Sequence, residues 1–210
     1  MASPAYPLPK QILDKTAALI LLAILLPLVA VVLAVTACDQ LLVRRDRGPF
    51  LYREDRISRG RIFGLIKFRT LRASVLEEMR AAGRHARLYE ADPANLTWAG
   101  RRLLKPWYLD EVPQLLNVLR GDMSLVGPRP WPPEMVARQV REGLTYRNEV
   151  AAGLTGPAQV TKGSGGRFAD LDLEYVSSCR QLGGWKLVRL DLALLADTVR
   201  VMARGEGLNY

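Results

Sequence analysis

The chain has 210 residues, of which 49% are hydrophobic and 24% are charged, a composition too apolar for a disordered protein. Lys and Arg number 30 against 21 Asp and Glu, so the formal net charge is +9. One His and two Cys exclude a zinc site built from several His or Cys ligands, and they exclude a disulfide framework. Any chemistry must therefore use carboxylates, lysines, arginines and hydroxyl groups.

The first expected element is an uncharged segment, Thr16 to Cys38. As a helix at ~1.5 Å per residue it would be about 35 Å long, enough to cross the hydrocarbon core of a membrane. Pro27 lies at its middle, where a proline in a helix interior costs roughly 3 kcal/mol. Basic residues flank both ends: Lys10, Lys15, Arg44, Arg45 and Arg47. This flanking charge favours both ends on the cytoplasmic side, so we expect a re-entrant helix broken at Pro27, with a single-span helix as the alternative.

A β-hairpin is expected next. Residues 50–57 and 62–70 are rich in β-branched and aromatic residues, and they flank a turn sequence at 58–61. Lys67 and Arg69 alternate along the second strand, so they would share a basic face. The region 53–72 holds seven basic residues and only two acidic ones, which indicates an anionic partner such as nucleic acid, acidic lipid or a phosphorylated substrate.

The rest of the chain is expected to be mostly helical. Apolar periodicity and capping residues predict helices at 72–90, 110–120, 131–150, 171–179 and 185–203. The charges of the first of these are interpreted as a solvated face. The Gly-rich stretch 153–166 has no helical pattern and predicts a loop. The last helix has Trp185 beside basic residues, which suits a helix at a membrane interface, with a core-packing helix as the alternative.

Two groups of residues could support chemistry. Asp110 and Glu111 are adjacent carboxylates at a helix start, where capping by Asp110 is the structural alternative to catalysis. Arg129 lies between two prolines, which restrict the backbone and would aim the guanidinium at a carboxylate or a phosphate. A rigid surface turn is the alternative there. Lys162 in the Gly-rich loop is a weaker candidate, because the loop lacks phosphate-loop spacing.

These residues lie in motifs that resemble the bacterial sugar transferase family, the monotopic phosphoglycosyl transferases. The strongest part is residues 109–130, LDEVPQLLNVLRGDMSLVGPRP. The other motifs follow in family order: Gly48-Pro49 through Lys67-Phe68-Arg69-Thr70, then Gly153-Leu154-Thr155-Gly156, and then 171–176. The resemblance covers residues 10 to 202, nearly the whole chain.

The resemblance implies transfer of a sugar 1-phosphate from a UDP-sugar to a polyprenol phosphate, the first membrane step of polysaccharide or glycoconjugate assembly. Asp110 would be the nucleophile, forming a covalent phosphosugar ester and releasing UMP, and Glu111 would bind Mg²⁺. Substrate contacts would come from Lys67, Arg69, Lys105, Pro128, Arg129, Pro130, Lys162 and Asp172.

The implied architecture is α+β and helix-dominated, with a re-entrant membrane helix, a small hairpin and interfacial amphipathic helices. Its domains would be a membrane segment over 1–47 and a catalytic domain at the membrane surface over 48–210. The location would be the cytoplasmic face of the bacterial inner membrane. Membrane lipid is a further expected partner and nucleic acid is not, and a homodimer is left open.

The chain departs from the family pattern around the dyad. Leu26 precedes Pro27 in place of Ser, Lys105 replaces an Arg, and Tyr108 replaces a Ser. Ala152 replaces a proline, and Thr161-Lys162-Gly163 stands in place of Asn-Gly-Arg. These differences concern substrate identity more than the dyad.

Two other functions stay open. One is a membrane-tethered relative with a lost or altered reaction, such as hydrolysis of the phosphosugar ester. The other is a non-enzymatic membrane anchor that binds acidic lipid or nucleic acid through residues 53–72. Binding by such an anchor would survive loss of Asp110 and would fall steeply with salt.

Overall fold

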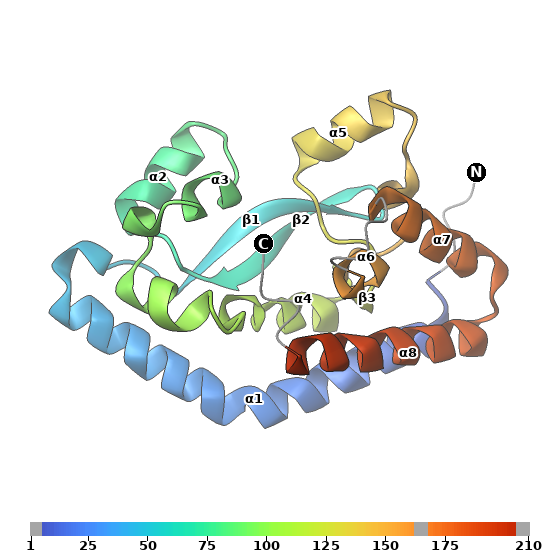
Figure 1. Ribbon diagram of the computed structural model, residues 1–210, viewed down its shortest axis with the longest axis horizontal. Coiled ribbons are helices and arrows are strands. Elements are labelled where there is room, and N and C mark those ends of the chain that lie inside the picture. The colour runs from blue at the N-terminus through green and yellow to red at the C-terminus, as the bar shows by residue number, and fades with distance from the viewer. Residues whose placement is uncertain (1–5, 162–167, 205–210) are drawn as a thin grey trace. The chain divides into compact units, whose positions relative to one another are not determined.

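The computed structural model describes residues 6–161 and 168–204 (Figure 1). The helices are α1 (Leu8–Leu42), α2 (Ala73–Ala81), α3 (Arg87–Glu90), α4 (Gln114–Arg120), α5 (Pro133–Arg141), α6 (Pro157–Val160), α7 (Phe168–Gln181) and α8 (Gly184–Ala203). The strands are β1 (Leu51–Ser58), β2 (Arg61–Phe68), β3 (Ser124–Val126) and β4 (Gly153–Thr155). The expected helix-dominated fold with a small hairpin is therefore confirmed.

The chain forms two compact units. The first unit comprises Met1–Ile20, Asp55–Gly64 and Leu115–Tyr210, and the second comprises Leu21–Glu54 and Leu65–Gln114. Helix α1 and the β1-β2 hairpin each contribute residues to both units.

Helix α1 has 35 residues and contains Pro27. Among the described residues it is the one helix long and apolar enough to cross a membrane, and only 11% of its most apolar stretch is buried. Its helical backbone continues through Pro27. The re-entrant topology, in which the chain leaves the membrane on the side where it entered, stays a prediction.

The hairpin forms as expected, with β1 and β2 side by side in Figure 1. Its two-residue turn is Arg59-Gly60, with φ angles of +52° and +70°. Positive φ at both central residues is the backbone of a type I′ turn, whose twist matches that of the flanking strands.

The second unit has two apolar clusters. One cluster contains Leu71 from the end of the hairpin and Leu76 and Met79 of α2. The helix expected over 72–90 is split into α2 and α3, because Gly83 between them has a left-handed φ of +59°. The other cluster joins Val32 of α1 to Phe68 and to Leu104, so this part of α1 packs directly on the hairpin.

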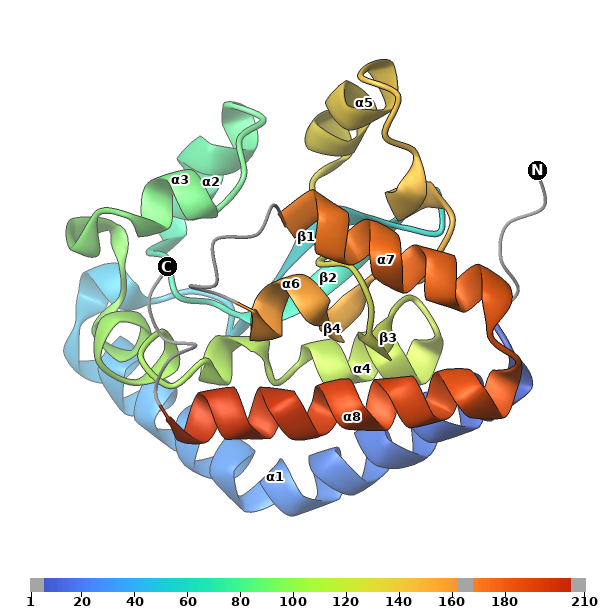
Figure 2. The same cartoon turned by 45° about the vertical axis from the view of Figure 1, so that its right-hand side comes forward.

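In the first unit, β3 and β4 pair in parallel, with Ser124 opposite Gly153 and Val126 opposite Thr155. Helix α8 contacts both strands, and α6 lies between α7 and α8 (Figure 2). The expectation of a plain loop over 153–166 is therefore wrong for its first part. The pairing depends on glycine, since a Cβ on Gly153 would lie 2.1 Å from the Gly127 nitrogen.

Candidate active site

The adjacent carboxylates lie in a short turn of the second unit. Asp110 is inside a single 3₁₀ turn, Leu109–Glu111, and not at the cap of a longer helix as expected. Tyr108 precedes the turn with a left-handed φ of +53°, which is rare for a residue with a side chain and stores local strain. The strain is held because Leu109 and Val112, on either side of the dyad, pack in the cluster around Phe68.

Three further charged side chains surround the dyad. Lys105 places its Nζ 3.4 Å from Asp110 Oδ2 and 2.6 Å from Glu90 Oε2. Lys67 Nζ lies 3.4 Å from Glu111 Oε1. Four residues expected in the site from the sequence are therefore brought together, and Glu90 is an addition. Thr70 fixes Glu90 from behind by donating a hydrogen bond of 2.9 Å to Oε1.

The pKa shifts follow from burial and from these contacts. Burial raises the pKa of Asp110, although Lys105 and Lys67 oppose the shift. Burial also acts on Glu90, but there the ammonium groups of Lys105 and Lys67 prevail and lower the pKa. Burial would lower the pKa of Lys105, but Asp110 and Glu90 outweigh it and raise the pKa, so Lys105 stays a cation at neutral pH.

The side chains of this cluster differ in access to solvent. The side chain of Asp110 is 2% exposed, whereas those of Glu111 and Lys105 are 17% and 31% exposed. A phosphate group approaching from solvent would therefore meet a lysine and a carboxylate before it reached Asp110.

The described residues contain no cluster of three or more His, Cys, Asp or Glu side chains that could hold a metal ion by themselves. Mg²⁺ does not need such a cluster, because it is commonly bound by one or two carboxylates together with substrate phosphates and water. The partly exposed carboxylate of Glu111 is a hard oxygen donor of this kind. The site therefore fits a magnesium ion that arrives with a phosphorylated substrate.

The expected basic face of Lys67 and Arg69 is not exposed, because both side chains are buried. The guanidinium of Arg69 donates to the backbone carbonyls of Pro49, Leu71 and Asp46 at 2.6 to 2.7 Å. These three bonds join the ends of the hairpin to the segment before it. Arg69 is thus a structural cross-link, and we do not include it among the proposed substrate contacts.

The first unit carries the GPRP segment, which comprises Gly127, Pro128, Arg129 and Pro130. Both prolines are buried and Arg129 is half-buried. The carbonyl of Pro128 accepts from Gly153 N–H at 2.9 Å, and Gly127 N–H donates to the backbone carbonyl of Thr155 at 2.8 Å. The segment is therefore fixed through its backbone as an extension of the β3-β4 pair.

Arg147 supports the same segment from behind. Its guanidinium donates to the Arg129 carbonyl at 2.5 Å and to Asp172 Oδ2 at 2.9 Å, and it stacks on the Trp131 ring at 4.0 Å. Burial raises the pKa of Asp172, against the opposing effect of Arg147. Asp172 is buried and paired with Arg147, so its carboxylate does not face solvent as the expected substrate contact would.

The sequence alone does not indicate a role for Glu90 or Arg147. Lys162, a candidate from the sequence, lies outside the described residues. The sequence groups Glu90 with a solvated helix face, because its pattern does not reveal the split of that helix at Gly83. The spacing of Asp92-Pro93 just after Glu90 marked the helix end, but only the folded chain shows that Lys105 lies there. Arg147 has no local signal, since the Arg129 carbonyl and Asp172 that it binds lie 18 and 25 positions away.

The sequence of the chain is similar to that of known proteins. The model of the bacterial sugar transferase family matches residues 5–205, nearly all of the chain.

Several curated proteins are similar to the chain. An undecaprenyl-phosphate galactose phosphotransferase of Salmonella typhimurium is 37% identical over 79% of this chain and 36% of its own length. A UDP-glucose:undecaprenyl-phosphate glucose-1-phosphate transferase of Caulobacter vibrioides is 35% identical over 93% of this chain and 73% of its own. An uncharacterized sugar transferase of Bacillus subtilis is 35% identical over 95% and 89%. The chain spans about a third of the length of some of these relatives, including the Salmonella protein and a glucose phosphotransferase of Komagataeibacter xylinus.

Proposed function

Since the chain belongs to the bacterial sugar transferase family, we propose that it transfers a sugar 1-phosphate from a UDP-sugar to undecaprenyl phosphate. The observation that carries the proposal is the buried Asp110 carboxylate held 3.4 Å from the Lys105 ammonium, in a cluster with Glu111 and Lys67. The names of the relatives support the same substrates.

In the first step, an Asp110 carboxylate oxygen attacks the sugar-bearing phosphorus of the donor. The new bond is an acyl phosphate ester, and the bond to the bridging oxygen of the diphosphate breaks, so UMP leaves with both bonding electrons. In the second step, an oxygen of undecaprenyl phosphate attacks the same phosphorus. This step restores the Asp110 carboxylate and yields the undecaprenyl diphosphate sugar.

Attack by an anion on a diphosphate needs nearby cations. Lys105 and Lys67 supply fixed positive charge beside the two carboxylates, and Lys105 is the more accessible of the two. Glu111 would hold Mg²⁺, which when bound would offset charge on the phosphates. In the first unit, Arg129 would bind a substrate phosphate with a guanidinium whose backbone cannot move away.

Two surfaces of the first unit support association with a membrane. The start of α1 exposes Leu8 and Ile12. Helix α8 exposes Trp185, Leu192 and Val199, which are spaced seven residues apart and so share one face, while Leu187 and Asp191, four residues apart, are buried on the other side. We propose that this face of α8 lies in the lipid headgroup region at the cytoplasmic side of the inner membrane.

The function is tested by incubating the membrane-embedded protein with undecaprenyl phosphate and a panel of UDP-sugars, and by measuring UMP and the lipid product. We expect UMP and undecaprenyl diphosphate sugar in equal amounts. Asp110→Asn should lower the rate on the order of 1,000-fold or more, because an amide is a poor nucleophile. The exposed carboxylate Glu77 gives a matched control, Glu77→Gln, with unchanged turnover.

Other outcomes would favour the alternative functions. Release of free sugar phosphate without lipid product would indicate hydrolysis. An unreactive protein that still binds acidic vesicles, with or without Asp110, would indicate an anchor.

The role of Glu111 is tested separately. Glu111→Gln should raise the Mg²⁺ concentration needed for half-maximal rate, because an amide oxygen carries no charge for the ion. An unchanged Mg²⁺ requirement in this variant would mean that another residue holds the metal.

The re-entrant topology is tested by labelling from outside the cell. A cysteine in place of Ser3, in a background without Cys38 and Cys179, should resist a membrane-impermeant thiol reagent in intact cells. Pro27→Ala should let the segment straighten and increase labelling. Labelling of the parent variant from outside would show that α1 spans the membrane.

A further inference from the structure

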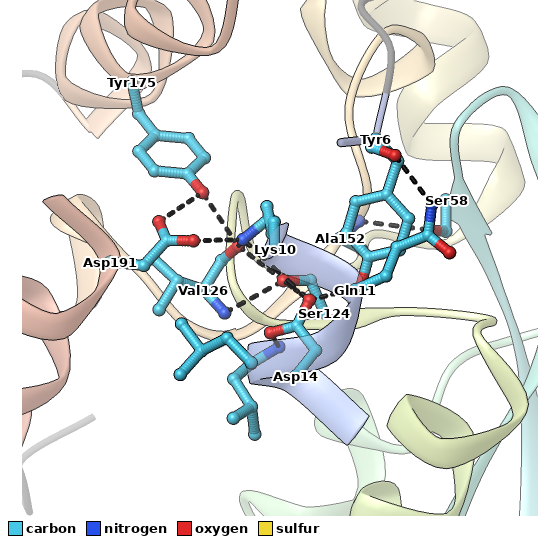
Figure 3. Close-up of polar contacts among 12 residues, drawn as sticks. Tyr6, Lys10, Gln11, Asp14, Ser58, Ser124, Val126, Ala152, Tyr175 and Asp191 are labelled. Atoms are coloured by element: carbon cyan, nitrogen blue, oxygen red, sulfur yellow. Dashed lines mark hydrogen bonds and ion pairs between the residues drawn. The ribbon is translucent and has the colours of Figure 1, made fainter. Parts of the chain in front are cut away.

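The N-terminal end of α1 is held in the first unit by a buried polar cluster (Figure 3). We call it the Lys10 cluster, and its side chains are Lys10, Asp14, Ser124, Tyr175 and Asp191. Lys10 is 3% exposed, Asp14 is 1% exposed and Asp191 is fully buried. The positive charge of Lys10, which was expected to act at the membrane flank, is therefore enclosed in protein, whereas that of Lys15 is exposed.

Two side chains of α1 complete the edge of β3 that faces away from β4. The strand pair uses the N–H groups of Ser124 and Gly127. Between them, Leu125 N–H donates to Asp14 Oδ1 at 3.0 Å, and the Ser124 hydroxyl donates to Asp14 Oδ2 at 2.7 Å. An open strand edge presents unpaired backbone N–H and C=O groups. Here Asp14 of α1 accepts such an N–H group, as a carbonyl of a neighbouring strand would.

Lys10 binds the last residue before the GPRP segment. Its Nζ donates to the Val126 carbonyl at 3.1 Å and lies 2.5 Å from Asp191 Oδ2. The hydroxyl of Tyr175 lies 3.0 Å from the same carbonyl and 2.8 Å from Asp191 Oδ1, and its single proton serves one of the two. Val126 is thus bound by Lys10 from outside the β3-β4 pair, with the Tyr175 hydroxyl within reach of the same oxygen.

These contacts bracket Arg129 from both sides. Lys10 donates to the carbonyl three residues before it, from which the Tyr175 hydroxyl is 3.0 Å away, and Arg147 donates to the carbonyl of Arg129 itself. We propose that Lys10 is a positioning residue for Arg129, through which the seating of the membrane helix controls the phosphate-binding segment. The proposal rests on the proposed role of Arg129 in binding a substrate phosphate.

The test compares two lysines of the same helix. Lys10→Met removes the buried ammonium, and Lys15→Met removes an exposed one from the same membrane flank. For the folded fraction of each variant in detergent, kcat and KM for the UDP-sugar are measured, together with hydrogen exchange of residues 124–131. We expect Lys10→Met to raise the donor KM about 10- to 100-fold and to speed exchange in the segment, since a misplacement of ~1 Å can cost about 100-fold. Lys15→Met should change neither.

A second variant covers poor folding of Lys10→Met. Tyr175→Phe removes one hydroxyl from the same carbonyl and keeps the charge pair, so it should change both readouts in the same direction and by less. The proposal is overturned if the donor KM and the exchange of both variants equal those of Lys15→Met, which would leave Lys10 a role in stability alone. If the wild-type protein releases no UMP with any donor, the proposed function fails, and the exchange comparison still decides whether Lys10 holds the segment.

Discussion

Asp110, the proposed nucleophile, and Arg129, the proposed phosphate-binding residue, are held in place in different ways. Asp110 is placed among charged side chains, with Lys105 and Glu90 within one ion-pair network. Arg129 is placed through its backbone, because the carbonyls around it are taken by Arg147, Gly153 and the Lys10 cluster. Changes near Asp110 should therefore alter the chemistry, whereas changes near Arg129 should alter binding or folding.

The largest effect is expected for Arg147, which supports the GPRP segment. Arg147→Met leaves the buried Asp172 carboxylate without its cation, and breaking such a pair costs about 3–5 kcal/mol. Urea unfolding of the detergent-solubilised protein measures this loss. Adding Asp172→Leu should recover most of it, since a buried pair can be replaced by apolar side chains. A double variant as unstable as the single one would contradict the charge argument.

Near Asp110, the corresponding change is Lys105→Met. We expect a smaller loss of stability than for Arg147→Met, because the Lys105 side chain is 31% exposed and the charge of Lys67 still acts on both carboxylates, while kcat/KM falls about 100-fold through loss of a preorganised cation. UMP release measures the rate, and Arg102→Met, an exposed change three residues earlier, is the control. Equal rates in the two variants would remove Lys105 from the site.

Arg129→Lys tests the arginine itself. Lys keeps the positive charge, and the backbone contacts of residue 129 stay in place, so the unfolding midpoint should change little. The donor kcat/KM should fall about tenfold or more, because Lys cannot form the planar fork of a guanidinium. Full activity of Arg129→Lys would mean that the GPRP segment is only a rigid turn and that the guanidinium is not needed.

The smallest effect concerns pH and Glu90. Its pKa lies below the ordinary value of 4.5, because the lysine charges outweigh burial. The ionised Glu90 therefore stabilises the fold, and the full effect is present above its ordinary pKa of about 4.5. This stabilisation is lost as the pH falls through the lower pKa of the folded state. Glu90→Gln should therefore lose less stability on acidification than the wild type, measured by thermal unfolding, with Glu77→Gln behaving as wild type.

The sequence predicts the local features well. The hairpin follows from its strand composition and its Arg59-Gly60 turn, and α8 follows from its apolar periodicity. The grouping of Lys67, Lys105, Asp110 and Glu111 was predicted only as an implication of the family resemblance. Their ion pairs agree with it, while their roles stay predictions.

The features that were missed depend on long-range contacts. The β3-β4 pair forms where Gly127 and Gly153 approach closely, and nothing in the Gly-rich stretch itself signals a strand. Arg69 and Asp172 appear as available charges in the sequence, but their partners are distant carbonyls and Arg147. Burial of a charge is decided by those partners, which neither the residue type nor the family motifs reveal, so the resemblance assigned these two side chains to the substrate.

The contact between Lys10 and Asp191 also sets an order of events during synthesis. The two residues are 181 positions apart, and Asp191 belongs to α8, the last helix of the described chain. Until α8 has been synthesised, the Lys10 ammonium has no partner at Asp191, so a membrane that received α1 before then would meet an unpaired charge of the kind that influences helix orientation. Only after α8 is complete can this ammonium pair with Asp191 inside the protein, so the last helix of the described chain is needed to bury a charge of the first.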